Sequence, residues 1–237
     1  MEHATYVTLA RQSGLVRELQ AVANNIANMG TTGFRSEGVI FSEFVRRTGG
    51  DESLSMAAAN VRATSTLPGE TAPTGAPFDF AIEGEGFFLV ETAAGERLTR
   101  AGSFTPNAAG ELVTPDGHRL LDAGGAPVFV PPDAAGVALA ADGTLSADGR
   151  PIGQIGLWAP VDPLGLRRED GVLFRAEGGT EPGAPGRILQ GYLEASNVDP
   201  IGEVARMVAV QRAYEMGQSF LDAENERLRT ALRTFVK

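Results

Sequence analysis

Candidate catalytic groups are few in this sequence, and their setting matches no familiar reaction centre. The chain has two histidines, His3 and His118, and no cysteine. His3 falls in an expected helix start and His118 in an expected hairpin, so a histidine-based triad lacks its nucleophile and orienting acid. The absence of cysteine excludes disulfides and thiolate metal sites. We therefore predict no enzyme, no cofactor and no metal.

Glycine-rich acidic motifs are the remaining candidates for chemistry. Residues 83–86, Glu-Gly-Glu-Gly, lack the third glycine and following helix of a dinucleotide-binding turn, and two carboxylates would repel phosphate. The Asp-Gly pairs at 142–143 and 148–149 lack the ordered ligands of an EF-hand. These motifs indicate tight turns. A carboxylate pair of the glycosidase type stays open, because thirty acidic residues make some pair inevitable and nothing singles one out.

Composition narrows the classes of protein further. The formal charge of -10 argues against a nucleic-acid binder. Thirty glycines and fourteen prolines, with few aromatic residues, favour turn-rich β structure. The first twenty residues lack a secretory signal pattern, and no run approaches the roughly 18 apolar residues of a membrane span. If the protein leaves the cytoplasm, we expect a route without a cleaved signal peptide.

The N-terminal region carries an apolar residue at every third or fourth position. This spacing predicts a helix with a narrow seam at the coiled-coil repeat of about 3.5 residues. We expect the helix over about 4–29, with Gly30 as a left-handed C-cap. The members of the seam are Leu15, Leu19, Val22, Ile26 and Met29.

The C-terminal region repeats the pattern. Asp199 and Pro200 supply an N-cap and a proline at the first helical position. Gly217 and Glu224 fit the seam less well than its apolar members. Neither terminal helix has an evident partner nearer than the other end of the chain, so we expect the two to pair. The members of the second seam are Met207, Val210, Tyr214, Gly217, Leu221, Glu224, Leu228, Ala231 and Phe235.

The middle of the chain alternates short apolar runs with glycine-containing turns. Residues 77–92 are expected to form two strands paired across the turn at 83–86, and further strands follow in 96–122 and 137–160, and near positions 171 and 187. Asp-Gly pairs between such runs indicate hairpins, because tight turns require positive φ. The pattern predicts an antiparallel sheet, arranged as a sandwich or an open barrel.

The predicted fold class is α+β, mainly β, with an antiparallel glycine-rich β domain flanked by terminal helices that pair as a coiled coil. We assign 1–29 and 200–237 to a terminal helical domain and 77–176 to the β domain. Residues 30–76 and 177–199 are assigned to extended connectors, since much of these ranges is rich in small and polar residues.

Three asparagines, Asn24, Asn25 and Asn28, stand close together at the end of the first helix. They are either solvated helix positions or hydrogen-bonding groups between closely packed helices, where alanine neighbours permit near approach. A buried polar group in a helix interface lowers stability but fixes register. The sequence leaves both interpretations open.

Four segments resemble the flagellar axial proteins, the subunits of the rod and hook. They are ANNIANMGTTGFRSE at 23–37, TAPTGAPFDFAIEGEGFFLV at 71–90, LTRAGSFTPNAAGELVTPDGHRLL at 98–121, and GYLEASNVDPIGEVARMVAVQRAYEMGQSFL at 191–221. The segments occur in the family order, from near one end of the chain to near the other, so the resemblance covers almost the whole chain. Ala101, before Gly102, departs from the family's Arg-Gly-Ser-Phe block.

The resemblance implies a non-enzymatic subunit of the flagellar basal-body rod, in the periplasmic space. It implies export through the flagellar type III apparatus without a cleaved signal. Partners would be other rod subunits and copies of the same chain in a helical assembly. Matches to the family motifs, together with the seams, give the expected assembly residues: Leu15, Leu19, Val22, Asn24, Asn25, Ile26, Asn28, Gly33, Phe34, Ser196, Asn197, Met207, Val210, Gln211, Tyr214, Leu221 and Leu228.

Within the family, the short length and the first forty residues are most similar to the proximal-rod subunits. The VQRAYE segment at 210–215 is shared with the distal-rod type, which stays an alternative. Two classes outside the family also stay open. A secreted β-rich binding module would need self-sufficient ends, and an envelope hydrolase acting on peptidoglycan would need a positioned carboxylate pair.

Overall fold

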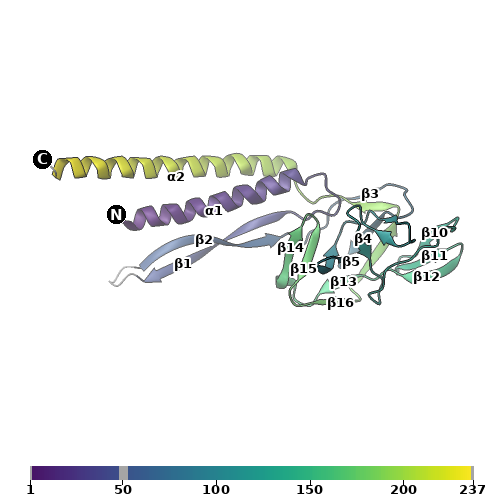
Figure 1. The fold of residues 1–237 in the computed structure, drawn as a ribbon. Coiled ribbons are helices and arrows are strands. Elements are labelled where there is room, and N and C mark those ends of the chain that lie inside the picture. The colour runs from purple at the N-terminus through teal and green to yellow at the C-terminus, as the bar shows by residue number, and fades with distance from the viewer. Residues whose placement is uncertain (1, 48–52, 236–237) are drawn as a thin grey trace. The chain divides into compact units, whose positions relative to one another are not determined.

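Two helices and a long hairpin form one unit of the chain, and short strands form the other (Figure 1). The computed structural model describes residues 2–47 and 53–235. Unit 1 contains the described residues of 1–29, 36–65 and 198–237, and unit 2 contains 30–35 and 66–197. The predicted α+β class with a majority of β structure and a helix near each end is confirmed.

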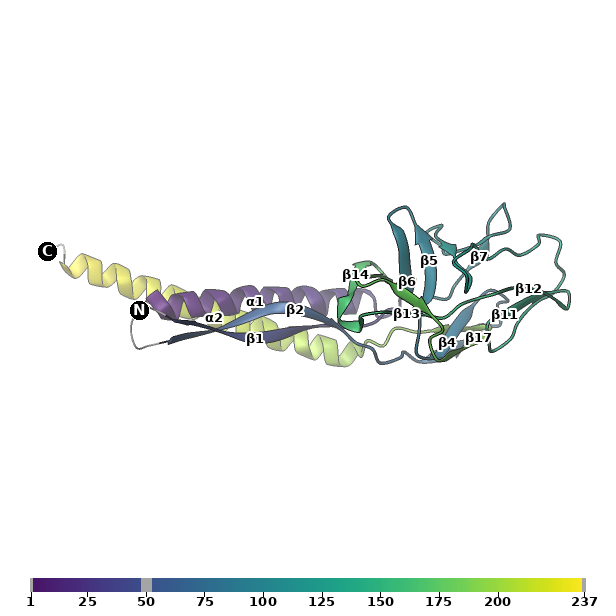
Figure 2. The same cartoon turned by 90° about the horizontal axis from the view of Figure 1, so that it is seen from below.

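The helices of unit 1 are α1 (Glu2–Ala27) and α2 (Pro200–Phe235). They lie side by side and run in opposite directions (Figures 1 and 2). The predicted start of α2 is confirmed, because Asp199 Oδ1 accepts a hydrogen bond from the backbone N–H of Ile201 at 3.1 Å. Since α2 has 36 residues and α1 has 26, the last turns of α2 extend beyond the start of α1 (Figure 2).

The predicted C-cap of α1 is wrong. The helix ends at Ala27, and Gly33 rather than Gly30 has a left-handed backbone, with φ of 68°. Asn28 explains the difference: its side-chain Nδ2 donates to the carbonyl of Asn24 at 2.8 Å. The same carbonyl also accepts from the Asn28 backbone N–H at 3.1 Å, so the backbone and side chain of Asn28 together close the last turn of the helix without a left-handed glycine.

A long antiparallel hairpin completes unit 1. Strand β1 (Glu37–Arg47) pairs with β2 (Ser53–Thr64), with a register shift between Ile40 and Phe41. Both strands contact α1. The hairpin lies inside the range that the sequence assigned to an extended connector, and it gives α1 a neighbour other than the opposite end of the chain.

The largest sheet of unit 2 has seven strands in the order β14-β15-β6-β5-β9-β8-β7. Every pairing between named strands is antiparallel, as predicted, and the sheets of the described residues do not close into a barrel. The strands are β5 (Phe88–Thr92), β6 (Gly95–Thr99), β7 (Thr105–Pro106), β8 (Leu112–Val113), β9 (Arg119–Leu120), β14 (Leu166–Asp170) and β15 (Leu173–Ala176).

Smaller sheets surround this one. A three-stranded sheet joins β10 (Val137–Leu139), β11 (Thr144–Ala147) and β12 (Arg150–Gln154) through the two Asp-Gly turns, which confirms both predicted hairpins. A short 3-10 helix, Pro163–Gly165, precedes β14. The remaining pairs are β13 (Trp158–Pro160) with β16 (Thr180–Pro182), β17 (Gly186–Gln190) with β4 (Phe80–Gly84), and β18 (Tyr192–Glu194) with β3 (Thr71–Pro73).

The predicted pairing of two strands across residues 83–86 is wrong. The glycines at 84 and 86 do have positive φ, of 100° and 112°, so the turn itself is confirmed. However, β4 pairs with β17, whereas β5 pairs with β6 and β9. The strand partner of β4 is thus supplied by a segment about a hundred residues further along the chain.

The main core of unit 2 gathers side chains from most of these strands. Phe80, Phe88 and Phe104 lie at its centre, and the rings of Phe88 and Phe104 meet edge to face at 5.5 Å. Trp158 and Phe174 belong to a second buried cluster with Leu89. Trp158 is the only tryptophan of the chain.

One hairpin turn carries a testable pH dependence. The backbone N–H of Thr144 donates to Asp142 Oδ1 at 2.9 Å, and this bond lowers the pKa of Asp142 from 3.8. The turn therefore contributes stability that is present above pH 3.8 and is lost as the pH falls through the lowered value. We expect Asp142→Asn, which keeps an acceptor oxygen, to reduce the acid sensitivity of unfolding by urea. An equal loss of stability on acidification in the variant and the parent protein would contradict this.

Candidate assembly surfaces

The predicted seam residues of the two helices differ widely in burial. Leu15, Val22 and Val210 are buried within unit 1. The half-buried members of the predicted set are Leu19, Ile26, Met207, Tyr214 and Leu221. Gln211 and Leu228 are exposed, Leu228 at 47%. Leu228 lies near the end of α2.

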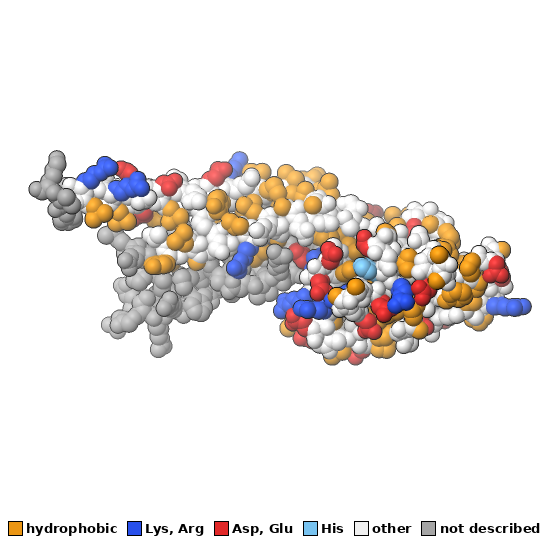
Figure 3. Space-filling model, viewed as in Figure 1, with side chains coloured by type: hydrophobic (Ala, Val, Ile, Leu, Met, Phe, Trp, Pro, Cys, Tyr) orange, Lys and Arg blue, Asp and Glu red, His pale blue; other side chains and the backbone are white. Residues whose placement is uncertain are grey.

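Both helices also carry large apolar side chains that the chain itself leaves exposed. Figure 3 shows hydrophobic side chains along α1 and α2. On α2, Ile201 is 82% exposed and Met216 66%. Contiguous exposed apolar surface is typical of interaction sites in soluble proteins. The exposed apolar residues of the helices, hereafter the helix surface, are Tyr6, Leu9, Val16, Ile201, Val204, Val208, Met216, Phe220, Leu228 and Leu232.

Asn25 and Asn28 form side-chain hydrogen bonds within unit 1. Asn25 is fully buried and forms two hydrogen bonds with the backbone of Glu37, at the start of β1. Its Nδ2 donates to the Glu37 carbonyl and its Oδ1 accepts from the Glu37 N–H, both at 2.8 Å. Asn25 thus pairs with β1 much as a neighbouring strand would, and it fixes where the hairpin begins relative to α1.

A buried carboxylate organises one region of unit 2. Glu194 is 1% exposed and forms ion pairs with Arg35 at 2.7 Å and with Arg100 at 3.2 Å. Its Oε1 also accepts from the backbone N–H of Gly69 at 3.0 Å. Burial lowers the pKa of Arg35 to about 10, although Glu194 partly offsets this, so Arg35 stays charged at neutral pH. Burial also lowers the pKa of Arg100.

Three segments meet around Glu194, and we call them the clasp: residues 33–35, 66–70 and 194–197. The Gly33 N–H donates to the Glu194 carbonyl at 2.7 Å, and the Asn197 N–H donates to the Phe34 carbonyl at 3.2 Å. Each segment lies next, in sequence, to residues of unit 1. The clasp therefore holds together, inside unit 2, the places where the chain enters and leaves this unit.

Side-chain packing at the clasp is tight. Gly33 combines positive φ with a position where an added Cβ would lie 2.3 Å from the Ala101 nitrogen, so only glycine fits. Phe34 is buried, with the Arg168 guanidinium 4.3 Å from its ring centre. Four of the expected assembly residues belong to the clasp: Gly33, Phe34, Asn197 and the half-buried Ser196.

Sequence reasoning missed the charged centre of this region. Arg35, Arg100 and Glu194 all lie inside the motif segments, yet their spacing of 65 and 94 residues gives no local signal. A glutamate in a short strand and an arginine after a glycine-phenylalanine pair read as ordinary surface residues. Only the fold shows that three charged side chains are buried together.

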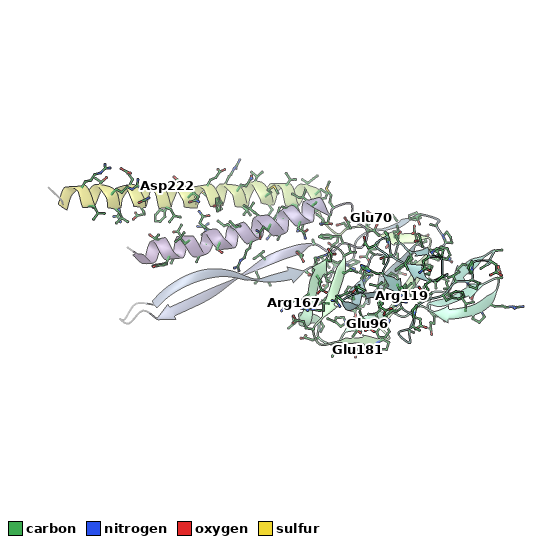
Figure 4. All side chains as sticks on the ribbon, in the orientation of Figure 1. Glu70, Glu96, Arg119, Arg167, Glu181 and Asp222 are labelled. Atoms are coloured by element: carbon green, nitrogen blue, oxygen red, sulfur yellow. The ribbon has the colours of Figure 1, made fainter. Side chains whose placement is uncertain are left out.

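Several other charged residues of unit 2 form more exposed pairs, although Arg97, which pairs with Glu169, is itself buried. Arg119, labelled in Figure 4, lies 2.6 Å from Glu91 and 3.6 Å from Glu111. Such solvent-exposed pairs contribute little to stability. Among residues 2–47 and 53–235, no three histidine or acidic side chains are grouped as a metal site requires. The helices of these residues include none that is long and apolar enough to cross a membrane.

Three family models match the chain. Residues 9–35 match the model described as flagella basal body rod protein, and residues 81–147 match the flagellar hook protein FlgE/F/G D1 domain. Residues 189–234 match the C-terminal model of the flagellar basal body rod FlgEFG proteins. The first and third of these cover the ends that carry the helix surface, and the second falls inside unit 2.

Curated relatives extend over nearly the whole chain. The flagellar basal-body rod protein FlgF of Mesorhizobium japonicum is 38% identical, over 91% of this chain and 90% of its own length. FlgF of Caulobacter vibrioides is 37% identical over 100% and 99%. The rod protein FlgG of Bacillus subtilis is 30% identical over 95% and 96%. These matches confirm the resemblance seen in the sequence, and the chain belongs to the flagellar basal-body rod protein family, in which it is most like FlgF.

Proposed function

We infer that this chain is a structural subunit of the flagellar basal-body rod and helps to form the drive shaft for motility. The observation that carries this inference is the helix surface, in a chain whose relatives are rod proteins along nearly their full length. The chain is 38% and 37% identical to the two FlgF proteins named above and 30% identical to FlgG of Bacillus subtilis. This difference supports a place in the proximal rod. A distal position is the alternative.

Assembly is proposed to bury the helix surface. Side chains such as Ile201 and Met216 are exposed in the single chain, and burying one large apolar side chain contributes about 1.5–3 kcal/mol. Head-to-tail contacts between copies that do not close into a ring produce a helical assembly. In this proposal α1 and α2 pair as a coiled coil within each subunit and stack against the helices of neighbouring subunits, while unit 2 contributes the β domain.

Three groups of expected assembly residues have different roles under this proposal. Leu228 and Gln211 are exposed on α2 and are available to a neighbouring subunit. The clasp residues Gly33, Phe34 and Asn197 act indirectly, by holding the entry and exit segments of unit 2 together. The buried seam residues, such as Leu15 and Val210, support the helix pair from which the helix surface projects.

Other parts of the proposal concern location and activity. We propose that the flagellar type III apparatus exports the chain without cleavage of a signal peptide, and that the chain then resides in the periplasmic part of the rod. The proposed role is structural rather than enzymatic, as the names of the relatives suggest. The proposed partners are copies of the same chain and other rod subunits.

The test is electron microscopy of basal bodies from a strain that lacks this gene, with the same strain carrying the gene on a plasmid as control. We expect the deletion to stop rod construction and abolish swimming, and the plasmid to restore both. Arrest before any rod is visible places the subunit in the proximal rod, whereas a truncated rod places it distally. Normal basal bodies and normal swimming in the deletion strain would overturn the proposed function.

A further inference from the structure

One polar side chain is buried between α1 and α2. Gln12 of α1 is 7% exposed, and its Nε2 donates to the backbone carbonyl of Tyr214 on α2 at 2.9 Å. The bond joins residues 202 positions apart, so it links the two ends of the chain directly. A polar contact inside a helix pair has a fixed geometry, whereas apolar contacts tolerate shifts.

Gly217 supplies the space that this contact needs. A Cβ at position 217 would lie 2.3 Å from Gln12 Nε2 and 3.0 Å from its Cδ. Glycine weakens a helix interior, so its presence near the middle of the 36-residue α2 calls for a reason. The close approach of the Gln12 amide provides one, and it explains why Gly217 breaks the apolar pattern of the seam.

The same amide is only partly satisfied. Gln12 Oε1 is buried, and within the described part of the chain it has no hydrogen-bond partner. A buried amide that leaves one group unbonded lowers stability compared with an apolar residue of similar size. Polar residues that persist in helix interfaces despite this cost are best known for fixing register.

The periodic seams do not by themselves fix the alignment of the two helices. Residues spaced by three and four repeat after seven positions, so the apolar members of each seam do not distinguish one alignment from the next. A slip of seven residues would place Gln12 opposite Val210 or Glu224 in place of Gly217. Both of these residues have side chains that fill the space that Gly217 leaves empty. Either slip would therefore force the end of the Gln12 side chain to move from its observed position.

We propose that Gln12 and Gly217 form a register lock, a steric and hydrogen-bonding pair that selects one alignment of α1 on α2. Gln12 is the positioning residue, and Gly217 leaves the space that admits it. The lock belongs to the single chain and does not depend on rod assembly. It fixes which side chains α2 presents beyond the start of α1.

Chemical crosslinking measures the alignment directly, because the natural chain has no cysteine. The reporter is the full-length protein with Glu18→Cys, Arg206→Cys and Ala213→Cys. Glu18 and Arg206 form an ion pair at 2.9 Å, so they mark the observed alignment, and Ala213 lies seven residues further along α2. A short bis-maleimide joins the thiol introduced at position 18 to the thiol at position 206 or to the one at position 213. Mass spectrometry of the monomeric products gives the ratio of the 18–206 product to the 18–213 product.

We expect the 18–206 product to exceed the 18–213 product by about tenfold, and Gln12→Leu or Gly217→Ala to bring the ratio close to one. Leucine is similar in size to glutamine, so the first variant removes mainly the polar contact, and the second expels the amide. Gln20→Leu, at an exposed position of α1, is the matched control and should leave the ratio unchanged. Circular dichroism checks that each variant keeps its helices.

Two results would overturn the register lock. One is a ratio that stays near tenfold in both Gln12→Leu and Gly217→Ala while the helices are intact. The other is a ratio near one in the reporter itself, which would mean that the helices have no preferred alignment. Because the crosslinking measurement uses the isolated chain, neither result bears on whether the protein builds a rod. The deletion experiment tests only the proposed function in the rod and does not test the register lock.

Discussion

Replacing Glu194 with glutamine is expected to destabilise unit 2 by about 3–5 kcal/mol, the typical effect of removing one partner from a buried ion pair. The substitution leaves the guanidinium groups of Arg35 and Arg100 buried near each other without their counter-charge. It also weakens the acceptor for the Gly69 N–H. Urea unfolding of the full chain, followed by the fluorescence of Trp158, measures the effect in unit 2.

Glu83→Gln is the matched control for this substitution. Glu83 forms an ion pair with Arg187 at 2.6 Å, but both side chains are more than half exposed. Exposed pairs contribute at most about 1 kcal/mol, so this variant should unfold close to the parent protein. Equal unfolding midpoints for Glu194→Gln and Glu83→Gln would show that the Glu194 cluster does not hold the clasp together.

Met216→Asp and Ile201→Asp are expected to prevent rod assembly while leaving the folded chain intact. Both side chains are exposed in the single chain, so a new charge there should change the free energy of unfolding by no more than about 0.5 kcal/mol. In the proposed rod the same positions are buried against neighbouring subunits, where an unpaired charge is strongly unfavourable. Swimming in soft agar and electron microscopy of basal bodies give the assembly readout, and urea unfolding gives the stability.

Ser219→Asp is the control for added charge. Ser219 is an exposed polar residue on the same helix, a few positions from Met216 and close to exposed Asp222 (Figure 4). We expect this variant to swim. Normal swimming by both Met216→Asp and Ile201→Asp would remove the helix surface from the interface, and a loss of swimming in Ser219→Asp would show that added negative charge alone blocks assembly.

Features set by neighbouring residues could be predicted well. The start of α2 at Pro200 follows from the capping residue beside it, and the Asp-Gly turns after β10 and β11 follow from the positive φ that such turns require. Helical periodicity also identified the two seams, because it needs only the spacing of apolar residues. The motifs that show the rod family lie in these same segments.

Features set by contacts between distant residues could not be predicted. In the β1–β2 hairpin, β1 contains bulky apolar residues but β2 is rich in small and polar ones, and the two strands gain their hydrogen bonds from each other and their neighbour from α1. Asn25 was noticed in the sequence as one of three neighbouring asparagines. Its partner could not be predicted, because Asn25 bonds to the backbone of Glu37, and backbone atoms are the same for nearly every residue type.

The sequence alone therefore determined the family, the α+β class, the start of α2 and the Asp-Gly turns, since each depends on residues close together along the chain. Only the tertiary structure decided which of the expected assembly residues the single chain buries and which it leaves exposed. Gly33, Phe34 and Asn197 belong to the clasp because the fold carries Glu194 to Arg35 across most of the chain. Burial depends on what covers a side chain in space, and that neighbour is often far away in sequence.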